Sequence, residues 1–174
     1  MSKKLQPKVS IQLYRNGEKA LSELSEMYRD YIKEIGQYSA KKLDPELRDV
    51  KTVKKYIIRE AGATAGFVFV SRYPESVVPE SIYIGEFYVK PEYRRKGIGT
   101  AAVSLAVIAA QVETVCMFTN VHNRAAASFW NHAMRGYRDG LEYGGVVACS
   151  GEDQALRFRI YSKAWLPEEK RSEN

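Results

Sequence analysis

The sequence predicts a mixed α/β fold, in which a central twisted sheet of about six to seven strands is flanked by about four helices. Residues 82–89 are rich in Ile, Tyr, Phe and Val, which favour strands. An almost wholly apolar, alanine-rich segment, residues 100–112, follows as a buried helix. Residues 114–119 are β-branched and apolar, so they form a strand parallel to 82–89 across that helix.

The N-terminal part of the chain predicts an edge strand and a covering helix. Apolar and polar residues alternate over 9–14, as in a strand with one buried face. Between 18 and 35 the apolar residues recur at helical spacing, which predicts an amphipathic helix lying on the sheet. Asp44-Pro45-Glu46 is a helix-start pattern and predicts a short helix over about 45–50.

The same patterns predict the remaining elements. They are strands at 56–60 and 65–73 around a turn at 61–63, a helix at 123–135 capped by Asn123 or Asn120, and strands at 137–143 and 155–163 joined by a glycine-rich loop at 144–151.

Length and composition indicate one domain over residues 1–174, with flexible tails at 1–8 and 167–174. The net charge of +6 favours an anionic ligand, and a polyphosphate cofactor is one candidate. Nucleic acid is not expected, because the Lys and Arg residues are scattered among acidic ones.

The cysteine and hydropathy patterns exclude two further classes. Cys116 and Cys149 form no CxxC or Cys/His cluster, so no metal site is expected, and Cys116 lies in an apolar run as a buried side chain does. The apolar run 101–110 is too short to span a bilayer, and the N-terminus lacks the apolar core of a signal peptide. We therefore expect a soluble cytoplasmic protein without membrane contact.

The junction between strand 82–89 and its helix is the candidate ligand site. Three cations, Arg94-Arg95-Lys96, precede Gly97-Ile98-Gly99. Glycines allow a tight turn and close approach, and the first amides of a helix lack intrahelical partners, which together suit phosphate oxygens. A tight turn beside a solvated basic loop is the alternative. The pattern Gly97-x-Gly99-x-x-Ala102 also fits a loose dinucleotide motif, but its first glycine stands far from the strand and no acidic residue ends the next strand.

These residues resemble the GNAT superfamily of N-acetyltransferases. Arg94-x-x-Gly97-x-Gly99 fulfils the family motif Q/R-x-x-G-x-G/A, and residues 87–93 resemble its fourth strand and the exit from it. A second motif is present as Asn123-Arg-Ala-Ala126-Ala-Ser-Phe129-Trp130 followed by Gly136-Tyr137. The resemblance is clear over roughly residues 54–140.

The resemblance implies acetyl-CoA as the acyl donor and a primary amine, on a small molecule or a peptide, as the acceptor. It implies that amides across 95–100 hold the pyrophosphate and that Phe87 to Val89 pair with the pantetheine arm like an added strand. Asn123 is either a polar contact to pantetheine or a loop anchor. The cofactor positions carried over are Phe87, Tyr88, Val89, Arg94, Arg95, Lys96, Gly97, Ile98, Gly99, Thr100, Asn123, Ala126 and Phe129.

Direct attack by the amine in a ternary complex is the implied mechanism. The resemblance implies that the amide of Val89 polarises the thioester carbonyl. Glu86, one residue before the cofactor-contacting segment, is the candidate base acting through a water, and its alternatives are a strand carboxylate paired with lysine or a binder of the cationic acceptor.

The general acid is where the sequence departs from the family. Trp130 stands where many relatives have tyrosine, and its indole cannot usefully deliver a proton. Tyr137 is the first substitute candidate and Tyr93 the second, or the thiolate leaves to solvent, and His122 is either a proton shuttle or structural. This departure keeps a non-catalytic acyl-CoA binder or sensor open, with a charged binding module as a third class. Dimers are common in the family, although nothing in the sequence indicates one.

Overall fold

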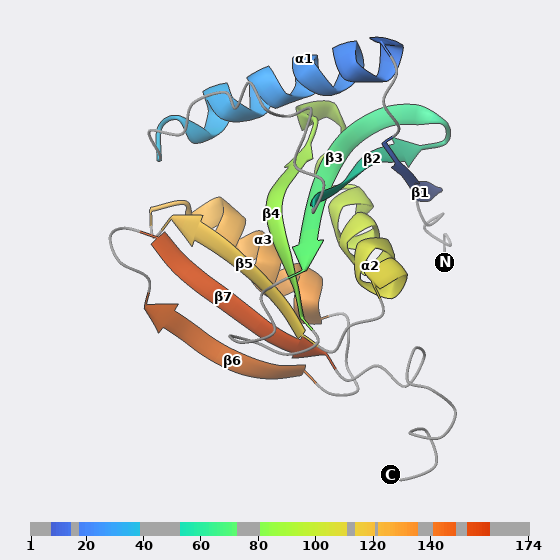
Figure 1. Cartoon of the computed structure of the whole chain (residues 1–174). Helices are drawn as coiled ribbons and strands as arrows, with labels where there is room; N and C mark the ends of the chain where they lie inside the picture. The colour runs from blue at the N-terminus through green and yellow to red at the C-terminus, as the bar shows by residue number, and fades with distance from the viewer. Residues whose placement is uncertain are drawn as a thin grey trace, which may run out of the picture. The chain divides into compact units, whose positions relative to one another are not determined.

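The computed structural model describes residues 8–14, 18–38, 53–72, 81–110, 114–120, 122–135, 141–148 and 153–160 (Figure 1). These residues form seven strands, three α-helices and one short 3-10 helix, which confirms the predicted mixed α/β class. They fall into two compact units: Met1–Ser71 with Gly85–Ala106, and Arg72–Ile84 with Val107–Asn174. The predicted helix at 45–50 and the tail at 167–174 lie outside the described residues.

The first unit contains an antiparallel meander. β1 (Val9–Leu13) pairs with β2 (Val53–Glu60), and β2 pairs with β3 (Ala63–Arg72). The predicted hairpin is confirmed, but its first strand begins three residues earlier, at Val53, and its turn is shorter. Ala61 and Gly62 both have positive φ, at 50° and 89°, as a two-residue hairpin turn that follows the strand twist requires.

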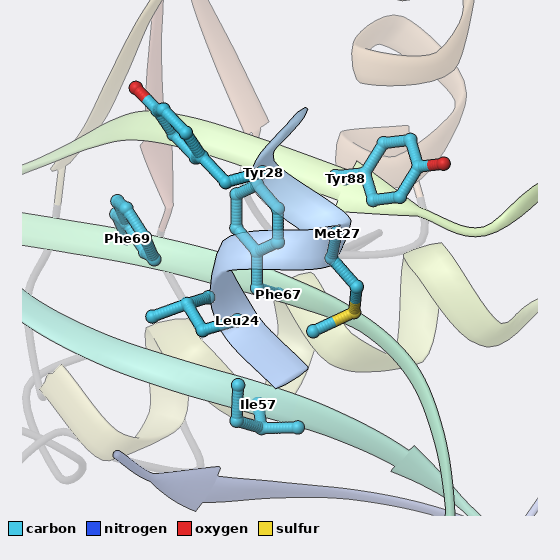
Figure 2. Close-up of a cluster of buried hydrophobic side chains, with 7 residues drawn as sticks. All are labelled: Leu24, Met27, Tyr28, Ile57, Phe67, Phe69 and Tyr88. Carbon is cyan, nitrogen blue, oxygen red and sulfur yellow. The ribbon is translucent and has the colours of Figure 1, made fainter. Parts of the chain in front are cut away.

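One face of this meander is covered by α1 (Glu18–Ile35), whose bounds are those predicted from its spacing. Its apolar stripe buries Leu24, Met27 and Tyr28 against side chains from three strands. Those side chains are Ile57 from β2, Phe67 and Phe69 from β3, and Tyr88 from β4 (Ser81–Val89) (Figure 2). The ring centroid of Tyr88 lies 6.0 Å from that of Tyr31 on α1 and 5.7 Å from that of Phe67, so aromatic packing holds the end of β4 against the helix.

In the second unit the strands are ordered β4, β5, β7, β6. β4 pairs in parallel with β5 (Thr114–Asn120), which confirms the predicted strand–helix–strand unit around α2 (Ile98–Ala110). β7 (Asp153–Ile160) pairs antiparallel with both β5 and β6 (Leu141–Ala148), and α3 (Arg124–Arg135) follows β5.

Two expectations for the strands were wrong in detail. Gly144 and Gly145 lie inside β6 rather than in a loop, and the β6–β7 register shifts between Tyr143 and Val146. The pair of glycines accommodates a local bulge, so the strand continues to Ala148. In β1, Leu13 does not continue the buried face, because its side chain is 45% exposed.

Cys116 is buried, as its apolar setting predicted. No helix among the described residues is both long and apolar enough to cross a membrane. The described part of the chain contains no cluster of three or more His, Cys, Asp or Glu side chains that could hold a metal ion.

Candidate functional site

The chain leaves β4 through a tight 3-10 turn, η1 (Pro91–Tyr93). Pro91 at its first position cannot donate to a sheet ladder, so the strand ends at Val89 as predicted. The amide of Lys90 still donates to the carbonyl oxygen of Ala65 on β3 at 2.9 Å, and the amide of Tyr93 donates to the carbonyl oxygen of Lys90 at 2.9 Å. These bonds fix the direction of the backbone where the basic segment, residues 94–96, begins.

The basic segment then turns through two left-handed residues. Arg95 has φ 62° and Gly97 has φ 79°. Glycine adopts this region freely, whereas an arginine there is strained, and such strain is characteristic of ligand clamps. Backbone in this conformation makes a concave nest of N–H groups that suits an anion.

α2 begins at Ile98, two residues before the predicted start, so Gly97 caps the helix and Gly99 lies in its first turn. The first helical bond runs from the amide of Ala101 to the carbonyl oxygen of Gly97 at 3.0 Å. The amides of Ile98, Gly99 and Thr100 therefore precede any intrahelical partner, and no described residue accepts a hydrogen bond from them. The Ile98 side chain is 1% exposed and anchors the turn in the core.

The three cations before the helix have different environments. Arg95 and Lys96 are exposed, and the Lys96 ammonium lies 5.8 Å from the ring centroid of Tyr93. The Arg94 guanidinium is instead paired with Glu34 at the surface, where it donates to both carboxylate oxygens at 2.9 and 2.6 Å and the two side chains are 36% and 44% exposed. The hydrogen bond with Glu34 is the largest cause that raises the pKa of Arg94 above its ordinary value.

The backbone at the end of β4 has a defined orientation. A side chain at Gly66 of β3 would overlap the carbonyl oxygen of Tyr88, so that carbonyl points toward β3. Because the peptide bond is trans, the N–H of Val89 in the same peptide points away from β3. The bond from Lys90 to Ala65 likewise turns the Val89 carbonyl away from β3. Both polar groups of Val89 therefore point away from β3, and the ladder with β5 ends earlier, at Ile84.

Glu86 and Tyr88 share one face of β4 by strand alternation. Glu86 is half-buried, with its Oε2 atom fully buried. Tyr88 packs against α1, and Figure 2 shows its hydroxyl pointing away from the other labelled side chains. Burial, followed by the nearby Asp30 carboxylate, raises the pKa of Tyr88. The phenol therefore keeps its proton near neutral pH.

In the second unit, Asn123 caps α3. Its Oδ1 atom accepts a hydrogen bond from the amide of Ala126 at 3.0 Å, and its carbonyl oxygen accepts one from the amide of Ala127 at 3.1 Å. Asn120, the alternative cap, instead accepts a bond at its Oδ1 from the amide of His122 at 2.9 Å. These bonds favour the loop-anchor interpretation of Asn123.

The other residues of the second motif have mixed environments. Ala126 and Phe129 are half-buried, and Phe129 lies edge-on to Trp130 with ring centroids 5.0 Å apart. Trp130 is buried, which suits a core role at the position where the resemblance led us to expect tyrosine. Tyr137, the first candidate for the general acid, lies outside the described residues.

Sequence reasoning missed two residues of this site. Glu34 was not singled out, because nothing local to α1 indicates a partner 60 positions further along the chain. Gly66 was also missed, although a glycine inside a strand is a known sign of close backbone approach.

A strained loop of left-handed residues, open first-turn amides and exposed cations together form an arrangement that suits a phosphate-bearing ligand where a strand meets a helix. The family is then identified by sequence. The model of the acetyltransferase (GNAT) family matches residues 20–137, more than half of the chain, and the protein belongs to that family. No curated protein sequence is similar enough to count as a relative.

Solved structures share the fold at low sequence identity. Spermidine N-acetyltransferase from Vibrio cholerae, in complex with CoA and spermine, is 12% identical, with 88% of this chain and 95% of that chain covered and a TM-score of 0.61. PaiA N-acetyltransferase from Thermoplasma acidophilum, in complex with coenzyme A, is 17% identical, with 87% and 99% covered and a TM-score of 0.59. A Bacillus subtilis acetyltransferase in complex with CoA is 17% identical, with 88% and 98% covered and a TM-score of 0.53.

Proposed function

We propose that this acetyltransferase moves an acetyl group from acetyl-CoA to a primary amine by direct attack in a ternary complex. The observation that carries the proposal is the set of first-turn amides of α2, at residues 98–100, which donate to no described residue. They directly follow the left-handed turn at Arg95 and Gly97 along the chain. Similar folds are known in complex with CoA, and one of them also with spermine, which supports this donor and an amine acceptor.

The diphosphate of CoA is the proposed ligand of the turn. Helix N-termini bind phosphate through their free N–H groups and the positive end of the dipole. The exposed side chains of Arg95 and Lys96 add two positive charges next to those groups. The pantetheine arm then follows the end of β4, where the backbone of Phe87 to Val89 continues beyond the β4–β5 ladder.

The proposed chemistry needs few protein groups. The neutral amine attacks the thioester carbonyl carbon, the carbon–sulfur bond breaks, and CoA leaves as a thiolate. The N–H of Val89, which points away from β3, hydrogen-bonds the carbonyl oxygen as negative charge develops there. Glu86 accepts the amine proton through a water, since it is half-buried on the same strand. Tyr137 or solvent returns a proton to the thiolate.

The acceptor is proposed only as a primary amine on a small molecule or a peptide. The experiment that tests the function is a screen of amines with acetyl-CoA and a colorimetric reading of the released thiol. We expect turnover with at least one amine and a raised melting temperature on adding acetyl-CoA. A protein that acetyl-CoA does not stabilise, and that releases no thiol, would contradict the proposal.

A non-catalytic acyl-CoA sensor is the second candidate, because Trp130 is buried where many relatives have tyrosine. The same screen separates the two functions. Stabilisation by acetyl-CoA without thiol release for any amine would favour the sensor. Replacement of Glu86 by Gln is the matched test of the enzyme, since it should lower turnover at neutral pH and leave CoA affinity unchanged.

A further inference from the structure

We propose that Arg94 is a positioning residue for the thioester, held in place by Glu34, rather than a ligand of the CoA diphosphate. This inference deepens the proposed function and rests on it. It changes the role that the family motif suggested for Arg94 and gives Glu34, on α1, a part in the acyl site.

The Arg94 side chain is engaged at three points. Its Nε atom donates to the carbonyl oxygen of Val89 at 2.7 Å. Its two terminal nitrogens donate to the two carboxylate oxygens of Glu34, in the two-pronged geometry that fixes a guanidinium plane. The plane also lies over the Tyr88 ring, with the guanidinium carbon 5.5 Å from the ring centroid.

These contacts leave the Arg94 guanidinium poorly placed to bind a phosphate. A diphosphate bound by the guanidinium would have to replace Glu34 as its anionic partner. Arg95 and Lys96 are exposed beside the helix N-terminus and meet that need without breaking any of the contacts of Arg94. The charge next to the phosphates is therefore assigned to the second and third cations of the segment.

The bond to Val89 is what connects Arg94 to the reacting atoms. The N–H and the C=O of Val89 point to the same side of β4, away from β3. Arg94 holds the carbonyl oxygen of the Val89–Lys90 peptide, and Ala65 of β3 accepts the N–H of that same peptide. The preceding peptide, which carries the Val89 N–H, is confined by the close approach of its Tyr88 carbonyl to Gly66 of β3. The three restraints fix the direction of the Val89 N–H before the thioester arrives, and preorganised donors of this kind stabilise a developing oxyanion most effectively.

Lysine is the informative substitution at this position. In Arg94→Lys the ammonium can still pair with Glu34 and lie over Tyr88, but it cannot keep the planar fork that also reaches the Val89 carbonyl. Glu34→Gln removes the charge that holds the fork and leaves Arg94 intact. Glu26→Gln is the matched control, since Glu26 is an exposed carboxylate on the same helix. Lys96→Gln is the positive control for weaker diphosphate binding.

The experiment measures two quantities for each variant: the dissociation constant of CoA by calorimetry, and the carbonyl stretching frequency of bound acetyl-CoA carrying ¹³C at the thioester carbon. In the unaltered protein we expect bound acetyl-CoA to stretch at a lower frequency than free acetyl-CoA, because the Val89 N–H polarises it. Arg94→Lys and Glu34→Gln should each return the frequency toward the free value, while the CoA dissociation constant changes less than about twofold. Glu26→Gln should change neither quantity.

Two results would overturn the inference. In one, Arg94→Lys weakens CoA binding as much as Lys96→Gln does and leaves the carbonyl frequency unchanged, which is the behaviour of a phosphate ligand. In the other, both variants bind CoA normally and keep the frequency of the unaltered protein, which is the behaviour of a purely structural pair. If Arg94→Lys does not fold, Glu34→Gln decides alone. Failure of the unaltered protein to bind CoA would instead contradict the proposed function itself, and no amine acceptor is needed for any of these measurements.

Discussion

Tyr88 joins the aromatic core to the candidate acyl site, and its protonation links stability to pH. Burial and the Asp30 carboxylate raise its pKa, while the Arg94 cation opposes them. A phenol that is harder to ionise in the folded state contributes stability that is fully present below its unfolded value of about 10. As the pH rises through that value, the unfolded chain loses its proton first, and the free energy of unfolding falls until the folded pKa is reached.

We therefore predict that the unaltered protein loses stability as the pH rises above about 10, the ordinary pKa of tyrosine, and that Tyr88→Phe loses less over the same rise. Urea unfolding at several pH values measures this difference. Tyr56→Phe is a parallel variant, because burial also raises the pKa of Tyr56. If the free energy of unfolding of Tyr88→Phe falls with rising pH as steeply as that of the unaltered protein, ionisation of Tyr88 is not linked to folding.

Gly66 is the residue on which the position of β4 depends most directly. A methyl group there would overlap the carbonyl oxygen of Tyr88 and crowd the Cα atom of Val89, at 3.0 Å. Backbone cannot move aside as a flexible side chain does, so β4 would have to shift. We expect Gly66→Ala to lower the free energy of unfolding by about 1–3 kcal/mol and to reduce amine acetylation further than this loss explains.

Gly62→Ala is the matched control for that prediction. A side chain at Gly62 meets nothing within 4 Å, but its φ of 89° disfavours any residue with a Cβ. Its cost should be about 1 kcal/mol of stability, with turnover per folded molecule unchanged. If both variants lose the same fraction of activity, the contact between β3 and β4 does not position the site.

At the scale of elements, the N-terminus of α2 carries the proposed phosphate site. Gly97→Glu or Gly99→Glu would place bulk and negative charge where the diphosphate is proposed to lie. We predict that either change raises the CoA dissociation constant more than about a hundredfold, equivalent to about 2.7 kcal/mol. Calorimetry measures the dissociation constant. Ala109→Glu is the control, because Ala109 is exposed near the other end of α2 and its substitution adds the same negative charge there. Unchanged CoA affinity in either glycine variant would count against the acyl-transfer function.

The N-terminus of α3 tests whether Asn123 is an anchor or a ligand. Removing the capping oxygen in Asn123→Ala should lower the free energy of unfolding by about 1 kcal/mol. Asn123→Ser keeps a capping oxygen, so it should restore most of that stability and leave CoA affinity unaltered. Denaturant unfolding and calorimetry on the same samples decide the point. Weaker CoA binding by a stable Ser variant would show that the amide nitrogen of Asn123 contacts the coenzyme.

Elements with strong periodicity could be predicted from the sequence, and elements shaped by long-range pairing could not. The spacing of apolar residues gave the bounds of α1, and the apolar run after Gly99 gave α2 to within two residues at its start. In β6 the glycine pair looked like a loop, because the strand is continued across it only by the pairing of the flanking residues Tyr143 and Val146 with β7. The site follows the same rule: the glycine turn is local and was predictable, whereas the pairing of Glu34 with Arg94 depends on how α1 packs.

For the whole molecule, the net charge of +6 raises the question of whether CoA is attracted by the overall field or by particular cations. At about 0.1 M salt, charges more than about 10 Å apart are largely screened. Only cations close to the diphosphate then contribute strongly. In the described part of the chain, Arg95 and Lys96 are exposed directly before the α2 amides, whereas Lys54 is an exposed cation on β2.

We predict that CoA affinity falls about tenfold when salt rises from about 0.05 M to about 0.5 M. Lys96→Gln should weaken binding at low salt and flatten this dependence, because one charge next to the phosphates is gone. Lys54→Gln removes the same unit of net charge from a strand of the meander, and it should leave both affinity and slope close to those of the unaltered protein. Calorimetric titrations at four salt concentrations give the slopes. Equal flattening by the two substitutions would mean that the overall field, rather than the segment before α2, attracts the coenzyme.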